Sequence, residues 1–456
     1  MAWLLGWDYN VAFMPYGDWW RRHIRALHQF FNSRAVLSYE PSKLKACRGL
    51  LQNLLKTPER FSEHIQFSMA RVIMDLKLWF IPLILTSPQV IYAIDIKPEN
   101  DFLVDMVHVA VEGAGNTILP GKLTRLFPVK YIPNWIPGIP FKKLVKKYKE
   151  PTDAISDIPF NTVLYAEQEK KNIDHSFVSR SLERLRTLKN PLPNEEAVIK
   201  NTAGIAYAAG AGTTFSGLIQ AVVASVLYPE VQKRLHDELD TVLGDRLPTL
   251  ADRKDLPYFN AFCYEVLRWR PGLPLAVPHA ALEDDIYGGY FIPKGSIVVA
   301  DAWYISQLST PSPLLCKFTS VNRSILRDEK YGPNPEEFNP ERFLQPGTRA
   351  PTEQFGFGRR ICPGRFFALN IMFLFMASIF KVYEIVPAKD ENGNDIPVTD
   401  RFIASGVTFF LLRTFYTIDI YPQSGDHNIV STISSEIFET RRPKKNECDE
   451  APTGKS

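Results

Sequence analysis

The ten residues 355–364, with the sequence FGFGRRICPG, constrain this chain more than any other segment. The glycines in it let the backbone turn sharply and approach a flat group closely. The following run, RFFALNIMFLFMASIF, has apolar residues at helical spacing, so Cys362 lies just before a predicted helix N-terminus. Free N–H groups and the helix dipole favour a cysteine thiolate there. A buried cysteine in a glycine-rich turn is the alternative, but ordinary residue frequencies give a chance match on the order of one in ten thousand.

This loop resembles the cysteine-ligand loop of the haem-thiolate monooxygenases, the cytochrome P-450 superfamily. The resemblance implies that Cys362 is the axial ligand of haem iron. It also implies that Phe355 packs beside the sulfur and that Arg360 meets a haem carboxylate. Gly358 and Gly364 complete the spacing of the motif and belong with these residues to the haem-binding loop.

Three charged residues upstream of the loop form a second part of the resemblance. Glu265 and Arg268, in YEVLRWRP, lie three apart on a predicted helix and share one face, where a carboxylate and a guanidinium can pair. Arg342, in FNPERF, would complete the Glu-Arg-Arg cluster by which the family locks its core near the haem loop. Taken singly, each charge is more often a solvated surface residue. Their order and their distances along the sequence to Cys362 match the family, which makes the set of three more specific than any one of them.

A long apolar stretch at residues 201–239 has small residues in its middle, which indicate a close approach or a kink in a helix. It resembles the family's long helix over the distal face of haem, where a hydroxyl and a neighbouring acid relay protons to bound dioxygen. Thr213 takes the hydroxyl position. Gly212 stands where the acid would be, so the relay is incomplete unless water or another side chain substitutes. A buried helix with small packing residues is the other interpretation, and the two are compatible.

Two further positions match contacts of the family with the haem propionates. Trp20 lies on a predicted helix with a basic face and would cover the propionates. Four residues later, Ile24 replaces the family's basic residue; His23 and Arg25 each lie about 100 degrees away on the helix, so neither is an automatic replacement. His279 matches a position that often contacts a propionate. For a lone histidine, a packing or surface role is the alternative.

Length and composition agree with this interpretation but do not indicate it by themselves. The chain has 456 residues, of which 45% are hydrophobic, and can bury a large core. Long helical patterns with few strand runs predict a mainly α fold with a small β-sheet (α+β) over residues 1–422, followed by a polar, disordered tail at 423–456. The net charge is only +3, and no basic patch with interleaved aromatics is present, which argues against nucleic-acid binding. The five unclustered cysteines disfavour a disulfide framework and a zinc site.

The resemblance covers about residues 6–420 and is similar to fungal members of secondary metabolism, of the O-methylsterigmatocystin-oxidoreductase-like kind. It implies a cytochrome P-450 fold and a monooxygenase that inserts one oxygen atom of O2 into an apolar small molecule. The cofactor would be haem b (iron protoporphyrin IX), whose thiolate ligand favours cleavage of the O–O bond. No GxGxxG fingerprint follows a predicted strand, so electrons would come from NADPH through a separate flavoprotein reductase. Arg359 and Arg365 are candidates to meet that partner.

Two other functions stay open. The first is an inactive or decayed haem-binding protein, which Gly212, Ile24 and the short N-terminal region support. The second is a reductase-independent haem-thiolate enzyme, a peroxide isomerase or peroxygenase, which would tolerate the loss of the acid. Turnover that depends on a reductase separates the monooxygenase from both.

Two segments interrupt well-matched sequence and read like translated introns. Removal of 76–89 would join IMD to VIYAIDIKPEND, and removal of 304–323 would join DAW to SILRDEKYGPNPEEFNPERF. A transmembrane segment at Leu78–Ile94 is the alternative for the first, and a looped-out insertion for the second. Only 19 residues precede Trp20. Family members carry about a hundred there, including the anchor that places them at the endoplasmic reticulum membrane. We therefore expect either an N-terminally truncated product without an anchor or a misplaced start codon.

Overall fold

The computed structural model describes residues 3–74, 91–92, 94, 101–118, 141–169, 176–273, 276–300, 325–398, 402–404, 409–411 and 418–423. The predicted insertions at 76–89 and 304–323 lie outside these residues, as does the predicted tail at 423–456 apart from its first residue. The proposals of retained introns and of a domain boundary at residue 422 therefore stay predictions.

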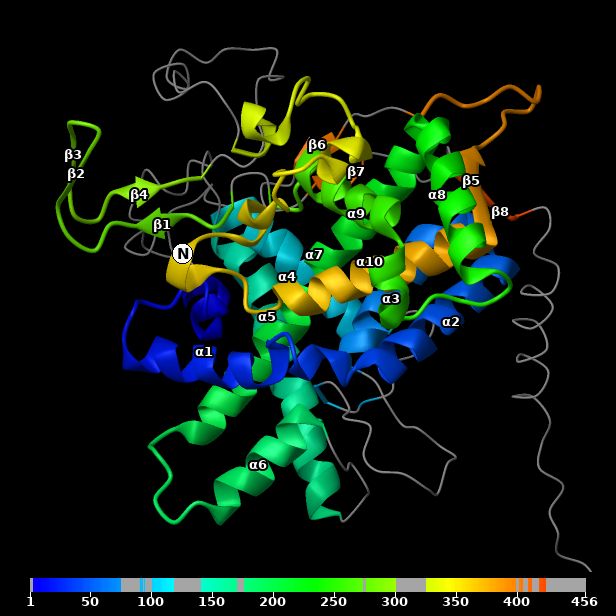
Figure 1. Cartoon of the computed structure of the whole chain (residues 1–456). Helices are drawn as coiled ribbons and strands as arrows, with labels where there is room; N and C mark the ends of the chain where they lie inside the picture. The colour runs from blue at the N-terminus through cyan, green and yellow to red at the C-terminus, as the bar shows by residue number, and fades with distance from the viewer. Residues whose placement is uncertain are drawn as a thin grey trace, which may run out of the picture.

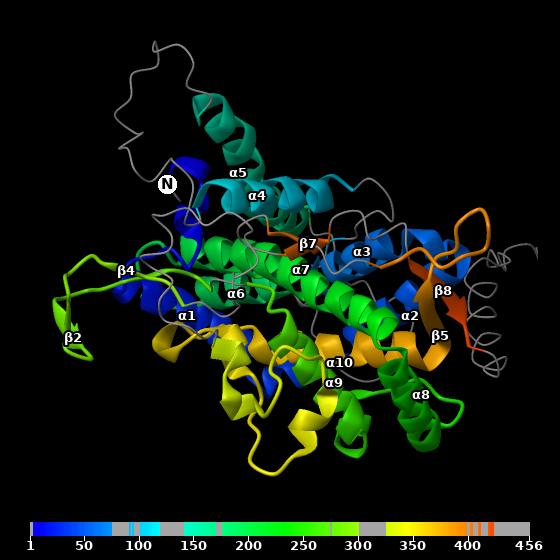
Figure 2. The same ribbon diagram turned by 90° about the horizontal axis from the view of Figure 1, so that it is seen from above.

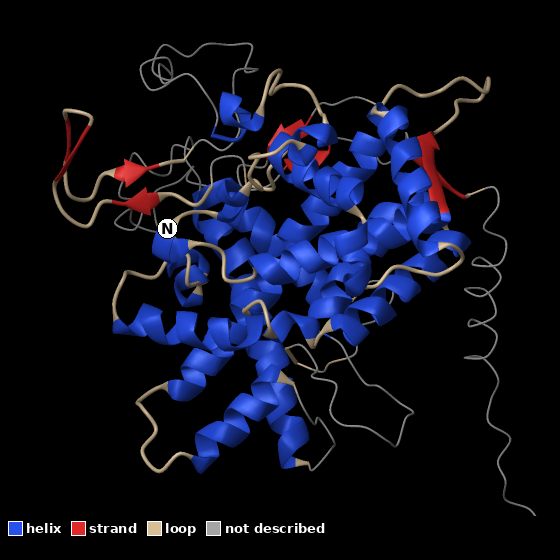
Figure 3. Ribbon diagram, viewed as in Figure 1, coloured by secondary structure: helices blue, strands red, loops and turns tan. Residues whose placement is uncertain are grey.

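The described part of the chain is mainly helical, as expected (Figures 1 and 3). Prolines in the first turn mark the starts of several helices, because a missing backbone N–H costs nothing there. The helices are α1 (Asp18–Phe31), α2 (Glu40–Lys56), α3 (Phe61–Met74), α4 (Phe102–Ile118), α5 (Phe141–Gln168), α6 (Phe177–Thr187), α7 (Glu195–Leu227), α8 (Pro229–Leu243), α9 (Pro257–Trp269) and α10 (Arg365–Val382).

The strands are short and form antiparallel pairs. The described pairs are β1 (His279–Ala280) with β4 (Ile297–Val298), β2 (Asp285–Tyr287) with β3 (Tyr290–Ile292), β5 (Tyr383–Pro387) with β8 (Ile418–Pro422), and β6 (Phe402–Ala404) with β7 (Phe409–Leu411). The β5–β8 pair packs against the helices through buried residues such as Ile385 and Ile420, which are directly opposite each other. The small β-content is therefore divided among separate pairs at the edge of a helical body.

Helices α7 and α10 lie together at the centre of the molecule (Figure 2). Their approach is close at Gly217 of α7, where an added Cβ would lie 3.1 Å from the Met372 Cε atom of α10. Both helices are long and apolar enough to cross a membrane, but 67% and 78% of their apolar windows are buried inside the protein. Burial on this scale is typical of core helices.

The segment from β1 to β4 extends away from the helical body (Figure 1). It carries large apolar side chains that are exposed to solvent, among them Ile286, Tyr287, Tyr290 and Phe291. Ile286 and Phe291 are cross-strand partners in the β2–β3 pair, so they form one apolar patch. Exposed apolar patches are sites of association.

Candidate active site

The loop before α10 is folded around Cys362. The Cys362 backbone N–H donates a 2.7 Å hydrogen bond to the Phe355 carbonyl, which closes the loop. Gly356 and Gly358 have φ angles of +82° and +52°, a region that side chains rarely adopt. At Gly364, an added Cβ would lie 3.9 Å from the Cys362 Sγ atom. The positive φ angles explain Gly356 and Gly358, whereas a Cβ at Gly364 would make only an ordinary contact with the sulfur.

Burial and nearby hydrogen-bond donors have opposite effects on the pKa of the Cys362 thiol. Burial, the largest of them, raises the pKa of the Cys362 thiol, whereas the Gly364 N–H, the Arg365 guanidinium and the Arg365 N–H act to lower it. Helix α10 begins at Arg365, as the sequence predicts, so the contribution of its N-terminus has the expected sign. A metal ion bound at the sulfur would add a positive charge that favours the thiolate.

Trp20 of α1 and Arg360 of the loop form a pair of donors. The Arg360 guanidinium lies 4.5 Å from the centroid of the Trp20 ring and donates 3.0 Å hydrogen bonds to the carbonyls of Val11 and Met14. The buried Trp20 Nε1–H has no hydrogen-bond partner among the described residues. A buried N–H without a partner is costly, and beside a guanidinium it suits a carboxylate. The residues present therefore fit a haem propionate.

The other residues near Trp20 do not replace the basic residue that the family has at position 24. His23 is buried, and its Nδ1 and Nε2 atoms lie 2.8 Å from the Trp19 carbonyl and 3.2 Å from the Asn201 amide. Burial lowers the pKa of His23, which favours the neutral ring. Arg25 lies on the exposed side, where its Nε is directed at the Arg21 carbonyl at 3.4 Å.

The middle of α7 is open on one side. Ala209 and Thr213 are exposed, although most of the surrounding helix is buried. The Thr213 Oγ1 donates a 2.8 Å hydrogen bond to the Ala209 carbonyl one turn before it. At Gly212, an added Cβ would meet only Val111 Cγ1, at 4.0 Å. Packing therefore does not require a glycine at this position.

Gly272, shortly after α9, connects α7 with the cysteine loop. A Cβ on Gly272 would lie 3.7 Å from the Thr213 carbonyl oxygen and 3.8 Å from Gln354 Nε2. Gln354 directly precedes Phe355, so Thr213 and the start of the loop both border the space beside Gly272. Sequence reasoning missed Gln354, because nothing in the periodicity of the chain relates it to α7.

Glu265, Arg268 and Arg342 meet in the core, where all are at most 5% exposed. Arg268 donates two hydrogen bonds to the Glu265 carboxylate, at 2.7 and 2.8 Å, and Arg342 donates one at 3.1 Å. The Asn339 N–H donates another, at 2.7 Å. The remaining guanidinium hydrogen bonds are accepted by the carbonyls of Leu326, Tyr331, Pro333, Asn334, Pro335 and Glu337. The cluster thus fastens the segment 326–342 to α9.

His279 lies on β1, in a different element from these residues. It is exposed on β1, opposite Val298 of β4. Within the described ranges, no hydrogen bond or ring contact joins it to the cysteine loop. Its predicted contact with a propionate therefore gains no support from its position.

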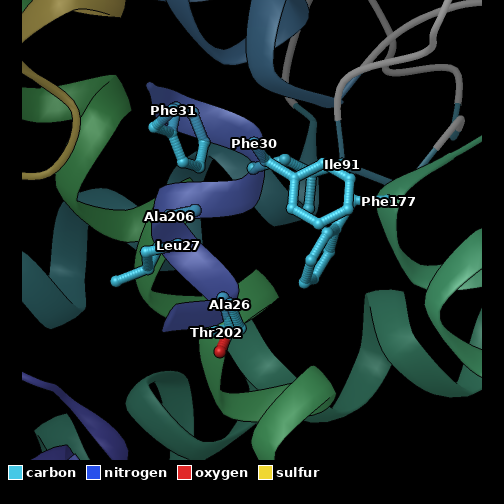
Figure 4. A pocket seen from close by; sticks show the side chains of 8 residues that line it. All are labelled: Ala26, Leu27, Phe30, Phe31, Ile91, Phe177, Thr202 and Ala206. Atoms are coloured by element: carbon cyan, nitrogen blue, oxygen red, sulfur yellow. The ribbon is translucent and has the colours of Figure 1, made fainter. Parts of the chain in front are cut away.

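A small apolar gap lies between α1, α6 and α7 (Figure 4). Phe30, Phe31, Ile91 and Phe177 line it together with the Thr202 hydroxyl, which is buried without a partner among the described residues. The gap is too narrow for a water molecule. We interpret it as a packing defect and not as a substrate site.

Comparisons with known proteins agree with this arrangement. The cytochrome P-450 family model matches residues 6–309 and 320–409. A cytochrome P-450 monooxygenase of Armillaria gallica is 36% identical over 400 residues, which cover 86% of this chain and 72% of that protein. Tryptamine 4-monooxygenase of Psilocybe cyanescens is 32% identical over 413 residues, which cover 87% of this chain and 73% of that protein. A zebra fish cytochrome P-450 solved with progesterone shares the fold, with a TM-score of 0.66 at 22% identity over 92% of this chain and 86% of that one.

The helical fold and the cysteine loop define a haem-thiolate oxidoreductase. The chain belongs to the cytochrome P-450 family and is a monooxygenase, an oxidoreductase that incorporates molecular oxygen. The predictions of family, fold and enzyme class are confirmed. The gap in the family match, 310–319, lies within the predicted insertion at 304–323, whose origin as an intron stays a prediction.

Proposed function

We propose that this protein uses haem b to insert one oxygen atom of O2 into an apolar small molecule, in fungal secondary metabolism or detoxification. One observation carries the proposal. The loop that presents Cys362 also places the Arg360 guanidinium over the ring of Trp20, whose indole N–H has no partner among the described residues. A sulfur ligand and a carboxylate site are therefore close to one loop. Iron protoporphyrin IX has an iron atom that the sulfur can bind and propionate carboxylates that the Trp20 and Arg360 site can bind.

Each residue of the loop has a defined part in this proposal. Cys362 would bind iron through Sγ, which the Gly364 and Arg365 N–H groups stabilise as a thiolate. Trp20 and Arg360 would bind a propionate, and Phe355 would cover the sulfur. The bound haem supplies the activation of oxygen, which a thiolate ligand assists by donating electron density to iron. Thr213, whose hydroxyl donates to the Ala209 carbonyl, would hold a proton at Oγ1 on the open side of α7.

Electrons would come from NADPH through a separate flavoprotein reductase. Arg21 and Arg359 flank the Tyr16 ring at 5.5 and 5.4 Å from its centroid, and Arg21 also pairs with Asp18. Arg359 therefore supports an acidic partner at the surface beside the cysteine loop. Hydrogen bonds from Arg21 and Arg359 lower the pKa of the Tyr16 hydroxyl. A location at the endoplasmic reticulum membrane, the usual one in the family, is part of the same proposal.

The test is oxygen incorporation by the haem-loaded protein under 18O2. The substrate panel includes terpenoids, fatty acids and indole compounds, the last because one relative is named for its action on tryptamine. We expect product with one 18O atom only when NADPH and a flavoprotein reductase are both present. Absence of product across the panel, from protein with a normal haem spectrum, would favour the inactive haem binder.

Gly212 favours a second candidate, a reductase-independent peroxide isomerase or peroxygenase, because such an enzyme has less need of an acid on α7. The same panel with hydrogen peroxide or organic peroxides in place of NADPH and the reductase separates the two. Faster turnover with peroxide than with the reductase would establish the second candidate.

A further inference from the structure

Tyr331 lies between the buried charge cluster of α9 and the segment before the cysteine loop. Its backbone carbonyl accepts a 2.8 Å hydrogen bond from the Arg342 guanidinium of that cluster. Its ring packs with Leu326 and Phe343 in a small apolar cluster, and only 2% of the residue is exposed. Both the backbone and the ring of Tyr331 are therefore held, which fixes the direction of its hydroxyl group.

The Tyr331 hydroxyl reaches the carboxylate of Glu353. It donates a 2.8 Å hydrogen bond to Glu353 Oε2, and the Lys330 ammonium donates one of 2.7 Å to Oε1. Burial raises the pKa of Glu353, but hydrogen bonds from Lys330, from its own backbone N–H and from Tyr331 outweigh burial, so the pKa lies below its usual value. The Lys330 side chain is 46% exposed, whereas Tyr331 is buried, so the bond from Tyr331 is the one that water competes with least.

Glu353 lies just before the cysteine loop and belongs to the turn that leads into it. The Glu353 carbonyl accepts a 3.0 Å hydrogen bond from the Gly356 N–H, which closes this turn. Between them in the sequence lies Phe355, whose carbonyl accepts the 2.7 Å hydrogen bond from the Cys362 N–H. The second half of the loop has a separate anchor, Arg360, which donates to two carbonyls of the N-terminal segment. The anchoring of Glu353 therefore acts on the half of the loop that holds the Cys362 backbone.

We propose that the hydrogen bond between Tyr331 and Glu353 is a latch that fixes the Phe355 carbonyl and, through the Cys362 N–H, the position of the sulfur ligand. The latch connects the buried cluster to the loop through side chains, in addition to the chain itself. A ligand atom that is held in place keeps its bond to a metal ion longer, because its release gains less conformational freedom. Tyr331 and Glu353 are positioning residues, since they act through the loop. The inference rests on the proposed binding of haem iron by Cys362.

The latch itself is tested by amide hydrogen exchange of the haem-loaded protein. Tyr331→Phe and Glu353→Ala should each raise the exchange rate of the peptide 355–364 by about tenfold, the factor expected for loss of one hydrogen bond to a charged group. The double variant should exchange more slowly than the product of the two single effects predicts, because both changes remove the same bond. Glu353→Gln should retain most of the protection, since its amide oxygen can accept from Tyr331. Unchanged exchange, or effects that multiply fully, would overturn the proposal.

The effect on the sulfur is measured with the reduced carbon monoxide adduct, at a temperature where circular dichroism shows the fold intact. Tyr331→Phe and Glu353→Ala should lose the red-shifted Soret band of thiolate coordination about tenfold faster than the parent protein. Tyr383→Phe is the matched control, because the Tyr383 hydroxyl is also buried and donates a 2.6 Å hydrogen bond to the Leu51 carbonyl. It should lower Tm and leave the rate of band loss unchanged.

Two results would show that this inference alone is wrong. In the first, Tyr383→Phe loses the band as fast as the other two variants, which would make general stability the cause. In the second, all three variants keep the rate of the parent protein. A parent protein that takes up haem and lacks the red-shifted band would instead contradict the proposed function, and the inference with it.

Discussion

At the scale of the residue, the glycines of α7 differ in what they do. A Cβ on Gly204 would lie 2.8 Å from the Ser156 Cβ atom and 3.1 Å from its Cα atom, so Gly204 permits a close contact between α7 and α5. A Cβ on Gly212 would meet only Val111, at 4.0 Å. Gly204 is thus required by packing, whereas the consequence of Gly212 is chemical, since it leaves α7 without a carboxylate beside Thr213.

Gly212→Asp should raise the product formed per NADPH severalfold, because a carboxylate beside Thr213 speeds protonation and shortens the time in which reduced oxygen escapes as superoxide or peroxide. The measurement is product and peroxide against NADPH consumed, with Thr213→Ala as the variant expected to lower coupling. If neither substitution changes coupling, this part of α7 does not relay protons.

The same two glycines should differ in their effect on stability. Gly212→Ala should stabilise the protein by about 0.5–1 kcal/mol, because alanine has the higher helix propensity and the space is free. Gly204→Ala should destabilise it, because the new Cβ collides with the Ser156 Cβ atom. Chemical denaturation of the haem-loaded variants measures both. Equal effects at the two positions would mean that the packing of α7 differs from the one described.

At the scale of the element, the cluster of Glu265, Arg268 and Arg342 joins α9 to the segment that leads to the cysteine loop. Glu265→Gln should cost about 3–5 kcal/mol, since two buried guanidiniums lose their counter-charge. Glu341→Gln is the matched control, because Glu341 pairs with Arg234 at the surface and contributes at most about 1 kcal/mol. Denaturation midpoints and haem content measure the two effects. A Glu265→Gln variant as stable as the control would contradict this description of the cluster.

The β2–β3 hairpin allows a separate prediction. Ile286 and Phe291 are exposed cross-strand partners, so the double variant Ile286→Thr, Phe291→Thr should leave the free energy of unfolding within about 0.5 kcal/mol. It should also raise the yield of soluble monomer, because the apolar patch is smaller. Size-exclusion chromatography measures the yield. A large loss of stability would show that other parts of the protein cover this hairpin.

The elements show what sequence can and cannot predict. The start of α10 after Cys362 and the pairing of Glu265 with Arg268 depend on spacing within one element, and helical periodicity predicts both. The approach of Gln354 to α7 and the exposure of His279 depend on how distant elements pack, which periodicity does not contain. The family resemblance predicted the roles of Arg342 and Trp20. It did not predict that the polar side-chain atoms of Ser216 and Gln220 are buried without a hydrogen-bond partner among the described residues.

At the scale of the whole molecule, the predicted insertions can be tested against the fold. The Ile94 N–H donates a 3.1 Å hydrogen bond to the Met74 carbonyl at the end of α3, so the chain on the two sides of 76–89 meets at one place. Deletion of 76–89 would shorten this connection from 19 residues to five, which lowers the entropic cost of loop closure by about 1 kcal/mol.

We therefore expect the variant without 76–89 and 304–323 to take up more haem and to unfold at a higher temperature than the chain as given. Haem content per protein and Tm measure this, and sequencing of mature transcripts is the independent check. Abundant spliced messages that contain both segments, together with stoichiometric haem uptake by the chain as given, would show that the segments are genuine loops.

The carbon monoxide difference spectrum of the haem-loaded protein tests the central claim most directly. With Cys362 as the axial ligand, the reduced carbonyl adduct shows the red-shifted Soret band of thiolate coordination. Cys362→Ala loses that band, while the variants Cys47→Ala and Cys263→Ala, which remove buried cysteines from the core, retain it. A Cys362→Ala protein with an unchanged spectrum would contradict the assignment of the ligand and the account of the site built on it.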